Sequence, residues 1–273
     1  MNYRAVGIYR EPEFSPGKVQ ADAAILDAAL AELAREGIET EALSPAQFLD
    51  RTELKADLVL AMCQSESALR RLAEVERDGA IAINSALAIR NCYRDLLAPG
   101  LDRAGVPTPV GVLVRTDERL DRRSLGGIDL GLPVFVKRGD LHALGADDVQ
   151  RALGKAEVEE KLGGLARRGV RRAYLQQEYP GGVIKFYGVS GGSYFTALPE
   201  NGEIPEAAVR ELSEAAQKAS AALGLEAWGG DAVLNEDRFA IIDFNDWPSF
   251  SRVRAQAARA IARRALSLLA RAR

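Results

Sequence analysis

The chain has 273 residues, of which 47% are hydrophobic and 27% charged, and its formal net charge is −3. These values are typical of a globular protein with one large domain or two to three small ones, and the acidic balance argues against a general nucleic-acid-binding protein. The sequence has no run of 18 apolar residues, so we expect no transmembrane helix, and its first residues lack the pattern of a secretory signal. We therefore expect a cytoplasmic protein with neither nucleic-acid nor membrane partners.

Cysteine, histidine and lysine are scarce, and this limits the kinds of metal site and catalytic site that the chain can form. The two cysteines, Cys63 and Cys92, cannot form a disulfide framework, and we interpret both as packing residues. The single histidine, His142, argues against a histidine-based metal cluster and against a Ser-His-Asp triad. We interpret it as a loop histidine, with a phosphate or substrate contact as the alternative. Only seven of the 36 basic residues are lysines, so a lysine inside an apolar run is a candidate functional residue.

Short strands and helices alternate in the first third of the chain. Strands are predicted at 3–9, 38–43, 58–62 and 79–84, and helices at 21–35 and 65–76. The continuous apolar run 58–62 is typical of a strand that is buried on both faces. Such alternation predicts a parallel sheet with crossover helices, so we expect residues 1 to about 90 to form a small doubly wound lobe.

The middle of the chain, residues 91–175, has the pattern of a small α+β lobe. We predict a helix at 91–104, a strand at 110–115, a helix and loop within 116–127, a strand at 132–137 and a mostly helical segment at 145–168. The Gly-Val-Pro-Thr-Pro segment at 105–109 separates the first helix from the first strand.

The last third, residues 176–273, combines antiparallel strands with two helices. Strands are predicted at 173–179, 183–189, 193–197, 232–235 and 239–245, and helices at about 205–223 and from about 253 to the end. The last two strands form a hairpin through the turn 236–238. The C-terminal helix has an apolar stripe, which either faces the core or forms a homodimer contact.

Three oxygen-bearing side chains of this hairpin are candidate metal ligands. Asp243 and Asn245 are two residues apart on one strand, so their side chains point to the same face, and Asp231 lies on the preceding strand of the hairpin. Oxygen ligands in this number suit Mg²⁺, which completes its coordination shell with water and phosphate oxygens. Because Asp243 lies inside an apolar run, it needs a partner, which weakens the alternative of a solvent-facing acid.

Two lysines are candidates for contact with phosphate or substrate. Lys137 ends an apolar strand beside a loop with two glycines, where its ammonium group can reach phosphates. Lys185 lies among Ile, Phe and Tyr residues and is expected to point into a site, a surface lysine being the alternative. Between the two, Gln177-Glu178-Tyr179 precedes a Pro-Gly-Gly turn at a cleft edge. Glu178 can accept hydrogen bonds from ribose hydroxyls, and the backbone of 177–179 can pair with an adenine edge.

The amino-terminal lobe offers further contacts. Arg10, Ser15 and Lys18 follow the first strand, at the end of an open sheet that faces the ligand crevice. The backbone amides of 62–65 open a helix and could meet an anion. If Arg10 and Lys18 converge with Lys185 and Arg252, the substrate is a small anion.

The order and spacing of these motifs resemble the ATP-grasp superfamily over about residues 84–252. In that family a Rossmann-like lobe precedes two α+β lobes that clasp ATP, so we predict a fold that combines α/β and α+β parts. The lobes would be 1–90, 91–175 and 176–273, the last with the metal site and the C-terminal helix. The resemblance assigns nucleotide binding to Arg94, Lys137, Gln177, Glu178 and Tyr179, and magnesium binding to Asp231, Asp243 and Asn245.

Three features depart from the ligases of this family. Arg94 stands where many members have lysine, Asp243 stands where most ligases have glutamate, and no Pro-Gly pair follows Asn245. The first two features, and the Gln177–Tyr187 segment, resemble the inositol polyphosphate kinase branch. Both branches share phosphoryl transfer from ATP with Mg²⁺, or with Mn²⁺.

We predict a carboxylate–amine or carboxylate–thiol ligase that activates a small anionic carboxylate through an acyl phosphate. A kinase that phosphorylates a hydroxyl group, and a nucleotide-binding protein without turnover, are the alternatives. Lys185 and Arg252 are predicted to bind the acceptor and the transferred phosphoryl group, whereas Arg254, two residues further on, points elsewhere.

Overall fold

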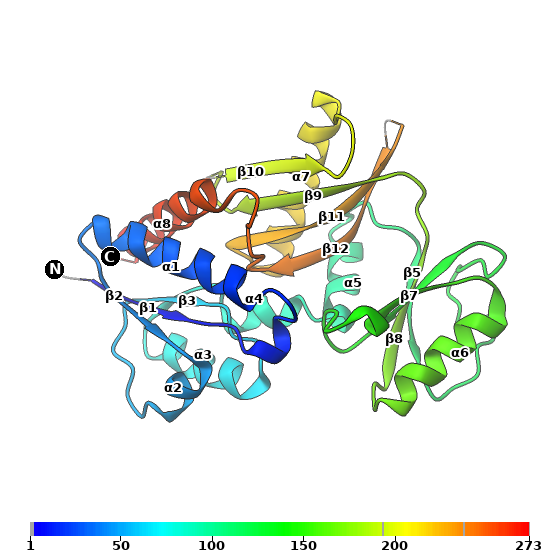
Figure 1. Cartoon of the computed structure of the whole chain (residues 1–273), viewed down its shortest axis with the longest axis horizontal. Helices are drawn as coiled ribbons and strands as arrows, with labels where there is room; N and C mark the ends of the chain where they lie inside the picture. The colour runs from blue at the N-terminus through cyan, green and yellow to red at the C-terminus, as the bar shows by residue number, and fades with distance from the viewer. Residues whose placement is uncertain (1–2, 193, 237, 273) are drawn as a thin grey trace.

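Three four-stranded sheets follow one another along the chain in the computed structural model, which describes residues 3–192, 194–236 and 238–272 (Figure 1). The first sheet is parallel, in the order β2-β1-β3-β4. Its strands are β1 (Arg4–Ile8), β2 (Glu39–Leu43), β3 (Leu58–Ala61) and β4 (Ile81–Ile83). None of the helices in the described part of the chain is long and apolar enough to cross a membrane.

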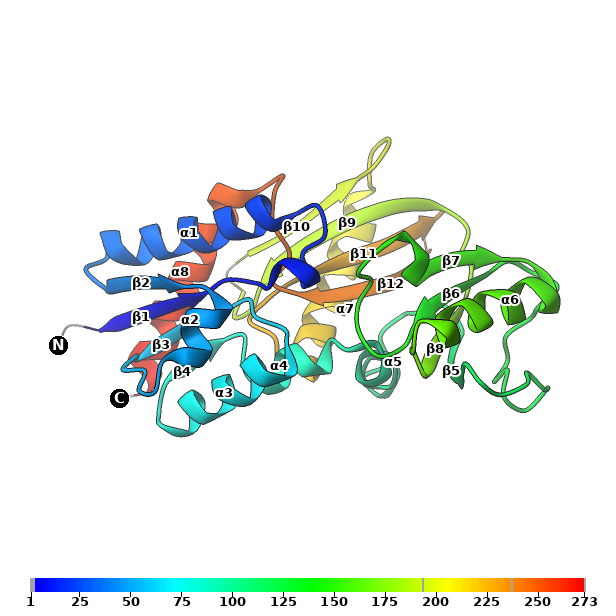
Figure 2. The ribbon, with the colours of Figure 1, turned by 60° about the horizontal axis from the view of Figure 1, so that its bottom comes forward.

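Helices cover both faces of the first sheet. The helices of this region are η1 (Pro12–Phe14), α1 (Val19–Arg35), α2 (Pro45–Asp50), α3 (Glu66–Arg77), α4 (Ala86–Asn91) and α5 (Arg94–Arg103). Helices α2 and α3 pack on one face through Phe48, Leu69 and Leu72. Helix α1 packs on the other face, where it is joined by α8 (Arg254–Arg271), the last helix of the chain (Figure 2).

The packing of α8 decides between the two interpretations of its apolar stripe. Ala257, Ile261, Ala265 and Leu269 are buried in the core cluster that also contains α1 and strands of the first sheet. The stripe therefore faces the core and gives no support to a homodimer contact. This helix, which was predicted to belong to the last lobe alone, packs against both the first sheet and the third.

The second sheet is antiparallel, in the order β5-β8-β6-β7, and α6 packs on it. Its elements are β5 (Gly111–Arg115), β6 (Val134–Arg138), η2 (Ala146–Asp148), β7 (Val149–Ala152), α6 (Gly154–Arg167) and β8 (Arg172–Gln177). The third sheet is antiparallel, in the order β10-β9-β11-β12. Its elements are β9 (Gly182–Val189), β10 (Tyr194–Pro199), α7 (Glu206–Leu223), β11 (Ala227–Asn235) and β12 (Arg238–Asp246).

The third sheet has one apolar face and one polar face. Helices α5 and α7 cover the apolar face, where Phe186, Trp228 and Phe244 are fully buried. Because strand side chains alternate between faces, the intervening residues Lys185 and Asp243 point to the opposite side. Helix α8 packs on part of this second face, at Tyr187 and Val189, and the rest of the face carries the predicted functional residues.

Several predicted elements differ from the structure. The helix predicted at 91–104 begins at Arg94, the segment 116–127 contains turns and no helix, and 145–168 contains β7 before α6 begins. Strand β7 is short and polar, and only its pairing with β6 makes it a strand. Ser193 and Asp237, part of a predicted strand and of the hairpin turn, lie outside the described residues.

Strand β11 begins five residues before the predicted start, at Ala227. The pair Gly229-Gly230 reads as a turn by composition, but both glycines lie inside the strand. A Cβ atom on Gly229 would meet the Phe186 carbonyl oxygen, and one on Gly230 would meet the Asp243 carbonyl oxygen. Glycine therefore allows the neighbouring strands to approach closely here.

Candidate active site

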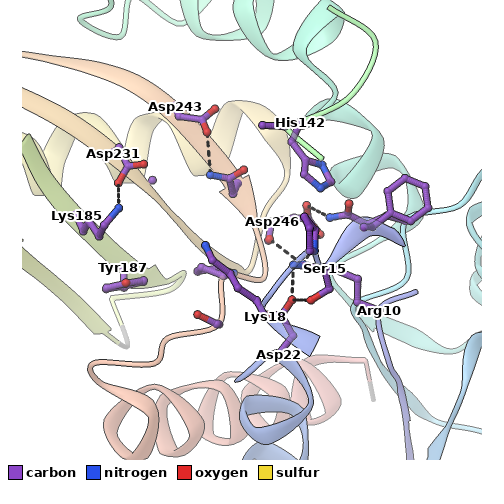
Figure 3. Close-up of a pocket in the computed structure, with 18 residues that line it drawn as sticks. Arg10, Ser15, Lys18, Asp22, His142, Lys185, Tyr187, Asp231, Asp243 and Asp246 are labelled. Carbon is purple, nitrogen blue, oxygen red and sulfur yellow. Dashed lines mark hydrogen bonds and ion pairs between the residues drawn. The ribbon is translucent and has the colours of Figure 1, made fainter. Parts of the chain in front are cut away.

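The polar face of the third sheet places the candidate ligands side by side. Lys185 of β9 lies opposite Asp231 of β11, which in turn lies opposite Asp243 of β12. Asn245 is two residues beyond Asp243 on the same face and donates a hydrogen bond from Nδ2 to Asp243 Oδ2, at 3.3 Å. The shared face expected for Asp243 and Asn245 is thus observed, and Lys185 points into the same site (Figure 3).

The two carboxylates of this row differ in electrostatic environment. Burial raises the pKa of Asp231, and Lys185, whose Nζ lies 2.9 Å from Asp231 Oδ1, offsets only part of this effect. Burial also acts on Asp243, but the charges of Arg94 and Lys137 outweigh it, so the pKa of Asp243 lies below its ordinary value. Asp243 is therefore ionised at neutral pH and is the stronger candidate ligand for a cation.

Two buried cations reach Asp243 from outside the third sheet. Arg94, at the start of α5, lies 3.6 Å from Asp243 Oδ1 and donates hydrogen bonds to the Arg138 and Leu141 carbonyl oxygens. Lys137, at the end of β6, is 5% exposed and donates from Nζ to the Ile242 carbonyl oxygen at 3.0 Å. Burial lowers the pKa of Lys137 to about 8, because the neighbouring acids offset only part of the desolvation.

The β6–β7 loop closes this side of the site. Asp148 anchors the loop by accepting hydrogen bonds from the Leu144 backbone at 2.8 Å and from Arg138 at 3.2 Å. His142 lies at its tip, with its ring centroid 6.3 Å from that of Phe14 in the first lobe. Burial, followed by the charge of Arg10, lowers the pKa of His142 to about 4. The imidazole is therefore neutral at physiological pH and lines the cavity, while a phosphate or substrate contact of His142 stays a prediction.

The segment 177–179, which is predicted to bind the nucleotide, has only part of its backbone available for hydrogen bonds to a ligand. The backbone N–H groups of Gln177 and Glu178 already donate to the Val110 and Pro133 carbonyl oxygens. The Tyr179 N–H makes no hydrogen bond within the described part of the chain, so it is available to an adenine edge. The Glu178 carboxylate forms a two-pronged ion pair with Arg151 of β7, at 2.8 and 2.9 Å, and a ribose would share it with that arginine.

A cavity of about 260 Å³ lies where the first lobe, the β6–β7 loop and the third sheet meet. Its wall combines four groups of residues. These are Arg10, Phe14, Ser15, Pro16, Lys18, Asp22 and Gln64 from the first lobe, His142 and Ala143 from the loop, Lys185, Tyr187, Gly230, Asp231, Asp243, Asn245 and Asp246 from the third sheet, and Pro248 and Ser249 from the turn after β12.

The loop after β1 is fixed by Arg10, and all three guanidinium nitrogens of Arg10 are engaged. They donate to the Met62 carbonyl oxygen, to Asp22 and to the Trp247 carbonyl oxygen, at 3.3, 3.1 and 2.8 Å. Ser15 Oγ donates to the same Asp22 carboxylate at 2.6 Å. Arg10 thus ties the first lobe to the turn after β12, and four of its five N–H donors are engaged by protein groups.

The anion predicted at the start of α3 belongs to the protein itself. The Glu11 carboxylate accepts hydrogen bonds from the Gln64 and Ser65 backbone N–H groups, at 2.9 and 3.0 Å. The sequence analysis did not identify Asp22, Gln64 and Asp246 as part of the cavity wall, nor Glu11 as the anion at the start of α3. The only sequence signal for Asp246 is its place directly after Asn245, and the others depend on contacts between distant segments.

The two arginines after the turn lie outside the cavity wall. Arg252 is exposed and does not line the cavity, although its charge slightly lowers the burial-raised pKa of Tyr187. Arg254 lines a separate groove beside the start of α1, as expected for a residue that points elsewhere. Of the four cations expected to converge, the structure brings Arg10, Lys18 and Lys185 together.

The chain has the ATP-grasp fold, as the sequence predicted. Its structure is similar to that of D-alanine–D-alanine ligase from Bacillus anthracis complexed with ATP, with a TM-score of 0.74, 13% identity and coverage of 98% of this chain and 99% of that chain. A second structure of the same ligase has a TM-score of 0.73, 13% identity and 99% coverage of both chains. D-Cycloserine synthetase DcsG has a TM-score of 0.69, 15% identity and coverage of 96% and 99%. No family model and no curated protein matches the chain.

Proposed function

We propose that the protein is an ATP- and Mg²⁺-dependent ligase that activates a small anionic carboxylate as an acyl phosphate and transfers the acyl group to an amine or thiol. The main observation in favour of the proposal is that Lys185, Asp231 and Asp243 lie opposite one another on three neighbouring strands and face a cavity. The positive charges of Arg94 and Lys137 act on Asp243 from outside this sheet. The names of the similar structures, a D-alanine–D-alanine ligase and a synthetase, support the ligase over the kinase alternative.

The donor set fits a magnesium ion. Among the described residues, no three His, Cys, Asp or Glu side chains form a metal cluster. The row instead offers the carboxylates of Asp231 and Asp243 and the amide oxygen of Asn245. Mg²⁺ favours such a set because it keeps several waters and takes phosphate oxygens as further ligands. When bound, the ion neutralises charge on the transferred phosphoryl group.

Two buried cationic side chains beside Asp243 are suited to bind a triphosphate. Lys137 and Arg94 are buried between the second and third sheets and would offset the phosphate charge there. The Glu178 carboxylate and the Tyr179 N–H lie directly after the last residue of β8 and would bind the ribose and the adenine. Phosphoryl transfer of this kind depends on positioning and electrostatics and needs no protein nucleophile.

Lys185 is the better supported of the two proposed catalytic residues. Its ammonium group lines the cavity and is held beside the candidate metal ligands by Asp231. From this position it would contact the acceptor carboxylate and the transferred phosphoryl group. Arg252 lies outside the cavity wall, so its predicted role requires a movement of the turn after β12.

The test is the effect of ATP and Mg²⁺ on stability, with a double variant, Asp243→Ala with Asn245→Ala. Ligand at about 100 times its Kd should stabilise the wild type by about 2.7 kcal/mol, and the Mg²⁺-dependent part should be lost in the variant. The control is Asn235→Ala, an exposed position on β11. Absence of any shift at saturating ATP–Mg²⁺ would contradict the proposal.

Hydroxylamine separates the ligase from the kinase. A ligase that forms an acyl phosphate should convert an accepted acid to its hydroxamate when hydroxylamine is present, with equimolar release of ADP. A kinase should instead release a stable phosphorylated alcohol and no hydroxamate. Lys185→Ala should reduce hydroxamate formation more than it reduces the stabilisation by ATP–Mg²⁺.

A further inference from the structure

Four residues that can carry positive charge line the cavity, and three of them are either already engaged by protein groups or neutral. Arg10 uses all three guanidinium nitrogens in contacts with Asp22 and two carbonyl oxygens. Lys185 is paired with Asp231 at 2.9 Å. His142 is neutral at physiological pH because burial lowers its pKa to about 4. The fourth is Lys18.

Lys18 is the cavity cation without a protein partner. Across the described residues, its ammonium group forms no hydrogen bond and no ion pair, yet the residue lines the cavity. Its side chain extends from the loop after β1 across the cavity, toward the wall formed by Lys185 and Tyr187 (Figure 3). The charge of Lys18 contributes, after Lys185, to lowering the burial-raised pKa of Asp231.

The backbone of Lys18 is held in place although its side chain is free. Its N–H donates to the Ser15 carbonyl oxygen at 3.0 Å, and Ser15 is 2% exposed and bound to Asp22. Asp22 is in turn bound to Arg10 at 3.1 Å. A buried network therefore fixes the point from which the lysine reaches into the cavity, which reduces the entropy cost of binding a ligand there.

We propose that Lys18 binds a second anionic group of the acid substrate, remote from the carboxylate that reacts. This inference rests on the proposed ligase function. The reacting carboxylate must lie beside Asp231, Asp243 and Asn245, where the phosphoryl group is transferred, whereas Lys18 enters from the opposite wall, on the first lobe. The substrate is thus a small dianion whose second group is a carboxylate or a phosphoryl-type group.

The size of the cavity is consistent with a small dianion. Its volume of about 260 Å³ equals that of about nine water molecules at about 30 Å³ each. The triphosphate would be bound by two other cations, Arg94 and Lys137, which lie beside Asp243 and do not line this cavity. Lys18 is therefore left for the substrate and not for ATP.

Acids that differ only at the end remote from the carboxylate test this assignment. The series is glutarate, 4-phosphonobutanoate, pentanoate and 4-aminobutanoate, which end in a carboxylate, a phosphonate, a methyl group and an ammonium group, with matched series one carbon shorter and one longer. ADP release and hydroxamate formation are measured with ATP, Mg²⁺ and hydroxylamine. The wild type should have a KM at least tenfold lower for a dianion than for its matched monoanion, and the better dianion identifies the second group.

Variants of Lys18 separate binding from catalysis. Lys18→Ala should raise the KM for the preferred dianion at least tenfold with kcat changed less than about twofold, because the contact is the same in the ground and transition states. Lys18→Arg should restore the KM, and Lys18→Glu should shift the preference toward the ammonium-ended acid. Lys55→Ala, at a position whose side chain is 79% exposed, is the control and should change nothing.

The outcomes distinguish this inference from the proposed function. A wild type that binds ATP–Mg²⁺ but does not prefer a dianion in any of the three series overturns the inference alone. Equal KM values for wild type and Lys18→Ala, or a fall in kcat without a rise in KM, overturn it as well. A wild type without an ATP–Mg²⁺ effect overturns the proposed function.

Discussion

Individual side chains in the site have protonation states that depend on where the fold places them. Lys137 is the clearest case, since burial lowers its pKa to about 8 although Asp243 lies nearby. An ammonium group that binds phosphate must be charged, so the proposed contact of Lys137 with ATP would raise its pKa. Above pH 8, the proposed ATP binding would therefore include the uptake of a proton.

This linkage predicts that ATP affinity falls in alkaline solution. The Kd for ATP should be nearly constant below about pH 7 and about tenfold larger at pH 9, since Lys137 of the free protein is then mostly neutral. Titration calorimetry at pH 7, 8 and 9 measures the effect. Lys137→Arg, which stays protonated, should show no such rise, and equal Kd values for the wild type at pH 7 and pH 9 would contradict the assignment.

At the scale of elements, the third sheet buries an aromatic cluster on one face and carries the candidate site on the other, because side chains alternate along its strands. On its apolar face, Trp228 stacks with Phe244 at a centroid distance of 5.6 Å and donates from Nε1 to Ser190 Oγ at 3.0 Å. The glycine at 188 in β9 faces Trp228, and a Cβ atom there would overlap the indole ring. This close approach lets the aromatic cluster pack beneath the row that carries Lys185.

Gly188→Ala should therefore destabilise the protein through overpacking. The free energy of unfolding is expected to fall by about 1–3 kcal/mol, as measured by urea denaturation. Gly182→Ala is the matched control, because this glycine of the same strand is exposed and a Cβ atom there meets nothing within 4 Å. A variant at 188 as stable as the one at 182 would show that Trp228 can move aside.

At the scale of the whole molecule, one junction holds the lobes around the cavity. Arg10, in the loop after β1, binds Asp22 of α1 and the backbone of Trp247, just after β12. Trp247 has a φ of 35°, a conformation that non-glycine residues rarely adopt, and its Nε1 donates to the Ile83 carbonyl oxygen at 2.8 Å. These contacts tie the first sheet to the strand that carries Asp243 and Asn245.

Arg10→Ala should be strongly destabilising because it leaves buried Asp22 without a counter-charge. The expected loss is about 3–5 kcal/mol in the free energy of unfolding, again measured in urea. Arg115→Ala removes an exposed ion pair with Asp117 and should leave stability unchanged. A loss below about 1 kcal/mol for the Arg10 variant would mean that the lobes are held mainly by their apolar contacts.

The sequence by itself determined the fold class, the order of the elements and most of the candidate ligands. Local patterns carry this information: apolar runs mark buried strands, and a spacing of two residues places Asp243 and Asn245 on one strand face. Short polar elements such as β7 were missed, because only pairing with a neighbouring strand makes them regular.

Only the tertiary structure decided which charges are free. Arg10, Lys18, Lys185 and Arg252 are all cationic, yet Arg10 is engaged by protein groups, Lys185 is paired and Arg252 lies outside the cavity. Lys18 faces the cavity with no partner among the described residues. Likewise, the amides at the start of α3 are satisfied by Glu11, more than fifty residues earlier in the sequence. Availability for a ligand depends on contacts between distant segments, and no local pattern encodes those contacts.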